Sequence, residues 1–152
     1  RADEFLAFDE AHRKTGDNLY AFVSSIESSV KKLALSAEER GEDPVYYYRF
    51  KPDIPGDDDP GTFHSCELWF FFETLAKCSR PYVGRHYDLA RQMCDYWCNF
   101  VKTGDPNGIG SDGKELPRWN PYTKEKEEGM EFTSEGAVPE AGEKEFTRFF
   151  LK

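Results

Sequence analysis

The sequence predicts an α/β fold with an incomplete sheet, in which a few strands are covered by several helices. Segments with helical periodicity alternate with short segments rich in β-branched and aromatic residues, which is typical of α/β layer structures. Only two segments have the composition of strands, too few for an independent sheet. We therefore expect the strands of this chain to pair with strands supplied from outside it.

The clearest helical pattern covers residues 17–40, which Gly41 follows. Apolar side chains recur there at steps of three and four residues, as on one face of a helix. These positions are Leu19, Phe22, Val23, Ile26, Val30, Leu33 and Ala37. A shorter pattern over residues 2–14 precedes it, and further helices are expected over 66–77 and 88–103.

The first predicted strand is Val45–Phe50, which carries three consecutive tyrosines between two prolines. Because polar residues do not alternate along it, we expect both faces to be covered and the strand to be central in the sheet. A second short strand is expected at 130–133. The intervening residues 108–129 are predicted as surface loop anchored by Trp119, and 143–151 as a terminal helix.

The length of 152 residues fits one domain region, whose predicted elements fall into three consecutive parts. Residues 1–44 form a helical lead-in. Residues 45–122 hold a strand, a loop with a histidine, and helices, and residues 123–152 hold a short strand and a terminal helix.

The charge balance excludes two classes of partner. The 152 residues carry 29 acidic against 20 basic side chains, a net charge of −9. Such a surface repels phosphates, so neither nucleic acid nor an anionic membrane is expected as a partner. The longest apolar run, Leu68–Phe72, cannot span a bilayer. Nothing resembles a signal peptide, so we expect a cytoplasmic protein.

The four cysteines, at positions 66, 78, 94 and 98, lack the spacing of a zinc site. A disulfide across one helical turn between Cys94 and Cys98 is geometrically awkward. We expect free, largely buried thiols and no metal. Gly108–Gly113 matches GxGxxG but follows a helix end rather than a strand, so we reject a dinucleotide site. Asp57–Asp59 is predicted as a charged turn rather than a cation site.

His64 differs in context from the other two histidines. His12 lies in a polar helical stretch, and His86, near a helix start, is expected to serve local structure. His64 follows a Pro- and Gly-rich loop after the first strand and precedes an aromatic segment. Functional sites of α/β sheets lie at the carboxyl ends of strands, and imidazole can act as a base near neutral pH.

Two motifs resemble those of type-B carboxylesterases, the family that contains cholinesterases and para-nitrobenzyl esterases. The stretch 61–68, GTFHSCEL, resembles the loop that carries the family's triad histidine. The stretch 96–107, YWCNFVKTGDPN, is similar to a helix end and turn of the same family, and 116–122 is similar to the segment after it. The resemblance implies the C-terminal portion of an α/β-hydrolase fold.

The resemblance also implies the chemistry. His64 would be the triad base, which takes a proton from a serine and returns it to the leaving alcohol. The serine, the acid and the oxyanion hole would lie upstream, and no GxSxG occurs in these residues, so the chain alone is expected to be inactive. Glu67 would support the loop rather than act as the acid. Residues 69–72 would line an acyl pocket or lie in the core.

The expected partners are then the N-terminal portion of the same enzyme and a small carboxylic ester, without a cofactor. Two alternatives stay open. One is a non-catalytic cholinesterase-like binding or adhesion module. The other is an independent acidic α/β domain that self-associates through exposed aromatic surface.

Overall fold

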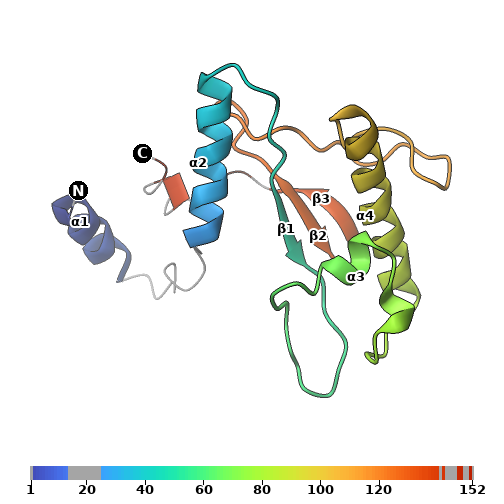
Figure 1. The fold of residues 1–152 in the computed structure, drawn as a ribbon. Coiled ribbons are helices and arrows are strands. Elements are labelled where there is room, and N and C mark those ends of the chain that lie inside the picture. The colour runs from blue at the N-terminus through green and yellow to red at the C-terminus, as the bar shows by residue number, and fades with distance from the viewer. Residues whose placement is uncertain (1, 14–24, 141, 143–146, 149–150, 152) are drawn as a thin grey trace.

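The computed structural model describes residues 2–13, 25–140, 142, 147–148 and 151. Its helices are α1 (Ala2–Arg13), α2 (Ser25–Glu39), α3 (Leu68–Phe71) and α4 (Gly84–Thr103), with one 3-10 turn, η2 (Leu75–Lys77). The strands are β1 (Tyr48–Lys51), β2 (Met130–Thr133) and β3 (Gly136–Pro139). The sheet lies between α2 on one side and α4 on the other (Figure 1). This layering confirms the predicted α/β class.

The sheet has the order β1-β2-β3. β1 runs parallel to β2, with Tyr48 opposite Met130, and β2 forms an antiparallel hairpin with β3. Strand β2 therefore occupies the middle, and β1 lies at an edge of the sheet that the described residues form. A central position for the first strand needs a further strand from outside the described residues, so it stays a prediction. That strand also begins three residues later than predicted.

The β3 strand was not predicted from the sequence. It begins with Gly136 and ends with Pro139, two residues that are unfavourable in strands. The tight turn after β2 brings them into pairing nonetheless, and Ala137 gains a further bond when its N–H donates to Gln92 Oε1 on α4 (2.8 Å). The hairpin geometry and this contact with α4 override the weak local preference.

The core lies between the sheet and one face of α4. Met93 and Tyr96 are fully buried there and face Trp119 and Phe132. The Tyr96 ring lies 5.5 Å from Trp119 and 5.8 Å from Phe132, both in edge-to-face geometry. Such aromatic pairs add about 0.5–1.5 kcal/mol each to the burial of apolar area. The helix starts at Gly84, four residues before the predicted start, and ends as predicted at Gly104, whose φ of 77° is the left-handed cap conformation.

The far end of the predicted apolar face of α4 is not covered by described residues. Trp97 is 44 %, Phe100 38 % and Val101 70 % exposed. The rings of Trp97 and Phe100, together with those of Tyr46 and Tyr48, border an apolar cavity of about 250 Å³. We call Tyr46, Tyr48, Trp97 and Phe100 the aromatic surface.

The packed face of helix α2 overlaps only in part with the predicted one: Val30 packs against the core and Ala37 is buried, as predicted. Ile26 and Leu33 are exposed at 72 % and 58 %, whereas Lys31 is fully buried and Ala34 nearly so. The Lys31 ammonium bonds to Glu27 at 2.9 Å and lies over two tyrosine rings, at 4.6 Å from the centre of Tyr47 and 5.6 Å from that of Tyr122. Paired charges and aromatic faces make this lysine compatible with burial, which a hydrophobicity pattern cannot anticipate. The first predicted face residues, Leu19, Phe22 and Val23, lie outside the described residues.

The other three predicted helices have different outcomes. The helix expected over 66–77 is divided into α3 and η2, because Glu73 has a φ of +48° that no helix continues through. The predicted helix over residues 2–14 is confirmed as α1. Of the terminal helix predicted over 143–151, residues 147–148 and 151 are helical and the others lie outside the described residues.

Among the residues that the structure describes, none of the helices is long and apolar enough to cross a membrane. All four cysteines are free, as predicted, and Cys94 Sγ lies 4.0 Å from Cys98 Sγ. Only Cys66 is buried, so the expectation of largely buried thiols is wrong for the other three. Burial raises the pKa of the Cys66 thiol.

Candidate active site in the histidine loop

His64 lies on the connection between β1 and α3, residues 52–67, which we call the histidine loop. The loop leaves the carboxyl end of β1 and projects beyond the sheet before it returns to α3 (Figure 1). The side chain of His64 is exposed, and no hydrogen bond or ion pair reaches it from the described part of the chain. Its imidazole is therefore open to solvent in the described structure.

The first residues of the loop are bound to the rest of the fold. The Asp53 N–H donates to Ser134 Oγ at 2.7 Å, and the next side chain, Ile54, is buried. The Asp53 carbonyl lies 3.2 Å from His86 Nε2. Since Nδ1 of His86 accepts from the Val83 N–H at 2.9 Å, its proton is on Nε2 and is donated to Asp53. His86 is thus a structural residue, as predicted, with both nitrogens engaged.

The tip of the loop is held by Arg80. Its guanidinium donates to the Pro55 carbonyl at 3.0 Å and makes two bonds of 3.0 Å to the Asp58 carboxylate. It also lies 5.3 Å from the centre of the Phe63 ring. These bonds from Arg80 hold the pKa of the Asp58 carboxyl below its ordinary value. The acidic run 57–59 is therefore a charged turn, as predicted. Sequence reasoning did not identify Arg80, because nothing in its spacing connects it to the loop.

A tight turn leads from His64 into α3. The N–H of Cys66 donates to the Phe63 carbonyl at 3.2 Å, and the N–H of Leu68 to that of Ser65 at 3.3 Å. Ser65 has a φ of +68°, a left-handed conformation that is uncommon outside glycine and often marks a functional position. The buried Cys66 then directs the chain back into the core, so that the turn leaves His64 on the outside.

The neighbouring predicted residues have divided roles. Glu67 stands at the start of α3 and its carboxylate makes no capping bond, and its expected support of the loop stays a prediction. Burial, with a smaller contribution from the charge of Glu67, raises the pKa of Tyr48 to about 12. Phe70 and Phe71 are core residues, whereas Phe72 is 60 % exposed.

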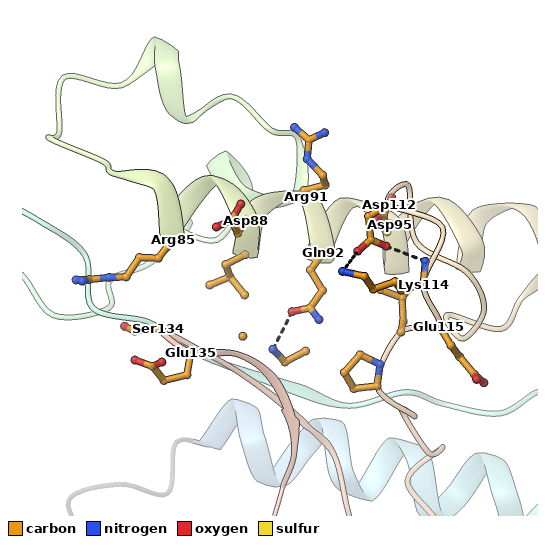
Figure 2. Close-up of a pocket in the computed structure, with 15 residues that line it drawn as sticks. Arg85, Asp88, Arg91, Gln92, Asp95, Asp112, Lys114, Glu115, Ser134 and Glu135 are labelled. Atoms are coloured by element: carbon orange, nitrogen blue, oxygen red, sulfur yellow. Dashed lines mark hydrogen bonds and ion pairs between the residues drawn. The ribbon is translucent and has the colours of Figure 1, made fainter.

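A larger cavity, of about 620 Å³, lies between α4, the loop after residue 110 and the β2–β3 turn (Figure 2). Its walls do not include the histidine loop. Many of its polar groups are bonded within the fold: Gln92 accepts from the Ala137 N–H, Asp95 accepts from Ser111 at 2.9 Å, and Lys114 pairs with a neighbouring aspartate at 3.3 Å. The cavity is a groove between structural elements and holds none of the predicted site residues.

The parallel β1–β2 pair between helical layers, with a histidine beyond the end of β1, defines part of an α/β-hydrolase fold. Residues 8–150 match the family model described as the carboxylesterase family. The chain therefore belongs to the carboxylesterase family, as the two motifs implied.

Two solved esterase structures and one curated relative are similar to this chain. The carboxylesterase EST55 of Geobacillus stearothermophilus superimposes with a TM-score of 0.59 at 26 % identity, over 78 % of this chain and 24 % of that one. A structure named PNB esterase gives a TM-score of 0.55 at 28 % identity, over 72 % and 21 %. Acetylcholinesterase 1 of Caenorhabditis elegans is 32 % identical over 115 residues, 73 % of this chain and 18 % of its own length. The chain thus spans about a fifth of the length of these relatives.

Proposed function

We propose that this chain is the C-terminal portion of a serine carboxylic ester hydrolase and supplies its triad base, His64. The observation that carries the proposal is the exposed imidazole beyond the end of β1, in a member of the carboxylesterase family, with no partner among the described residues. A buried structural histidine has its nitrogens satisfied, as His86 does. His64 makes no such bonds within the described residues, so both ring nitrogens are available to exchange a proton with a reacting group.

In the proposed reaction His64 acts twice. It accepts the proton of a serine hydroxyl as the serine oxygen attacks the ester carbonyl, and it returns that proton to the alcohol oxygen as the ester bond breaks. Water then repeats the sequence on the acyl-serine. The sequence of this chain contains no GxSxG, so we propose that the serine comes from the partner portion of the enzyme and that the chain alone is inactive.

Two features support a partner portion. Strand β1 has a neighbour on one side only in the described sheet. The aromatic surface borders an apolar cavity beside it, and exposed rings of this kind mark places where other protein packs. We propose that the N-terminal portion of the enzyme adds strands at β1 and covers the aromatic surface. Self-association of this chain through the same surface is the competing outcome.

The test is hydrolysis of p-nitrophenyl acetate by the full-length protein and its variants. We expect His64→Ala to lower kcat by at least about 10³-fold, in line with the loss of a triad member, and to leave the unfolding midpoint nearly unchanged because the side chain is exposed. His86→Gln is the matched control. It should lower the unfolding midpoint, since His86 is 2 % exposed and bonds to Asp53 and Val83, and its kcat per folded molecule should fall far less than that of His64→Ala, because His86 supports the loop and takes no part in the proposed proton transfers.

Near-normal turnover by the His64→Ala variant would overturn the assigned role. A full-length protein without serine-type turnover would favour the non-catalytic binding module instead. The chain alone should hydrolyse the ester no faster than free imidazole, and inhibitor-sensitive turnover by these 152 residues would refute the proposed division of the site.

A further inference from the structure

We infer that Arg80 is the positioning residue for His64: its guanidinium joins the two halves of the histidine loop and so fixes where the imidazole stands. This inference rests on the proposed function of His64. It adds a second residue, outside the loop and 16 positions further along the chain, on which turnover should depend.

Arg80 contacts three groups of the histidine loop. Two lie in the first half of the loop, the Pro55 carbonyl and the Asp58 carboxylate, with three hydrogen bonds of 3.0 Å in all. The third is the ring of Phe63 in the second half, 5.3 Å from the guanidinium carbon, within the range of a cation–π contact. Phe63 is the residue directly before His64. One side chain therefore holds both the descending and the returning halves of the loop.

The loop also leaves space for this guanidinium, because Gly56 lies against it. A Cβ atom added at Gly56 would collide with Arg80 Nη1 and with Asp58 Oδ1. With any other residue at this position, the ends of the Arg80 and Asp58 side chains would have to move. Arg80 itself is only 20 % exposed, although its partner Asp58 is 61 % exposed. The loop folds over the arginine rather than meeting it at the surface.

The backbone of Arg80 is connected to the core through Tyr82. The N–H of Tyr82, two residues on, donates to the Arg80 carbonyl at 2.8 Å. The Tyr82 ring packs edge-to-face on Phe70 at 5.7 Å and on His86 at 5.3 Å. The arginine is therefore tied to the core and to the start of α4, and it transmits that position to the loop.

Few other contacts within the described residues hold His64 and its neighbours in place. Within the described residues its imidazole has no partner, and the turn that follows it depends on two backbone hydrogen bonds of 3.2 and 3.3 Å. Phe63 has one other described ring contact, with Trp69 at 5.9 Å. Without Arg80 the first half of the loop would be anchored only at Asp53 and Ile54, far from the tip. A displacement of about 1 Å at a reacting group can lower a rate by about 100-fold.

The experiment compares variants of the full-length protein in steady-state hydrolysis of p-nitrophenyl acetate, with the unfolding midpoint measured for each. For Arg80→Gln we expect kcat and kcat/KM to fall together by about tenfold or more, because His64 acts in the transition state and not in substrate binding. Asp58→Asn should give a smaller parallel loss, since the bond to Pro55 remains. Gly56→Ala should give a smaller loss in the same direction, because the flexible ends of the Arg80 and Asp58 side chains must move to make room for the methyl group.

Arg85→Gln is the matched control. Arg85 also pairs with the histidine loop, with Asp53 at 3.5 Å, but both side chains are largely exposed. Its kcat should stay within about twofold of the parent value.

The inference is overturned if Arg80→Gln and Gly56→Ala retain kcat as Arg85→Gln does, or if they change KM alone. It is also overturned if their losses only match the loss of folded protein. These results leave the proposed function intact as long as His64→Ala is inactive. Failure of the proposed function is recognised separately, by an active His64→Ala variant.

Discussion

The histidine loop and the connection that follows α4 are both long and irregular, and they are held in opposite ways. In the second, residues 104–122, which we call the anchor segment, Asn107 accepts from the Trp119 N–H at 2.7 Å and donates to its carbonyl at 2.8 Å. The indole is buried at 6 % exposure. The histidine loop has a half-exposed ion pair at its tip and an exposed histidine beyond it.

This difference separates two kinds of family motif. The motif around residues 102–107 specifies architecture: Gly104 caps α4, and the Asp105 carboxylate accepts from the backbone and the side chain of Asn107 at 2.9 and 2.6 Å. These polar groups make hydrogen bonds to one another within the fold. In the motif around His64 the central side chain is bonded to nothing among the described residues. The first motif is thus engaged in the fold, whereas the second leaves its histidine available for the proposed reaction.

The largest effect is expected where the anchor segment meets the core. Trp119→Ala should reduce the free energy of unfolding by about 3–5 kcal/mol, because a buried indole in contact with four rings is lost. Denaturant unfolding followed by circular dichroism measures this. Trp119→Phe is the control: it keeps most of the packing and loses the Nε1–H bond to the Tyr47 carbonyl, at a cost of about 1–2 kcal/mol. Equal stability of the alanine variant and the parent would remove the contrast between the two connections.

A smaller effect is expected at Asn107. Asn107→Ala leaves both backbone groups of Trp119 without their partner, which costs about 1–3 kcal/mol for each group that stays dry. The same unfolding experiment measures it. Asn99→Ala is the control, because the one bond from Asn99 Nδ2 to the Pro106 carbonyl is long, 3.4 Å, and its loss should cost less than 1 kcal/mol. If the two variants were alike, Asn107 would not be the anchor.

The smallest effect on stability is expected at the tip of the histidine loop, and it depends on pH. The pKa of Asp58 is lower in the folded protein because Arg80 donates hydrogen bonds to its carboxylate. The contact therefore stabilises the folded loop at pH above the unfolded value of about 3.9 and is lost as the pH falls through the lower folded value.

Limited proteolysis within the loop should then be faster in Arg80→Gln than in the parent at pH 6. With an acid-active protease the difference should narrow as the pH falls through the lowered pKa of Asp58, down to the part that the bond from Arg80 to the Pro55 carbonyl maintains. A difference that did not narrow at any acid pH would show that the carboxylate is not the partner that matters.

Prediction from the sequence succeeded where a local signal and the packed structure agree. The second strand, 130–133, has the predicted bounds, and the left-handed glycine that ends α4 is at its predicted position. The class of fold followed from the alternation of elements. His64 stood out by its place after a strand, and its assignment came from the resemblance.

The remaining features depend on contacts between distant residues. The packed face of α2 was predicted only in part, because Lys31 is buried by its ionic and aromatic partners. The β3 strand forms because a hairpin brings Gly136 opposite Thr133. Arg80 meets Asp58 across 22 positions of sequence with no periodic pattern to connect them. Composition and spacing carry no record of such pairs.

The buried ammonium of Lys31 has a practical consequence for labelling chemistry. Reagents that acylate amines reach only lysines that meet solvent, and Lys31 is fully enclosed while α2 lies on the sheet. Modification at this position then requires α2 to lift away, so its rate reports the opening of that layer, whereas exposed Lys32 next to it reacts in the closed state. One helix thus carries both a reporter of its own detachment and an internal reference for the reagent.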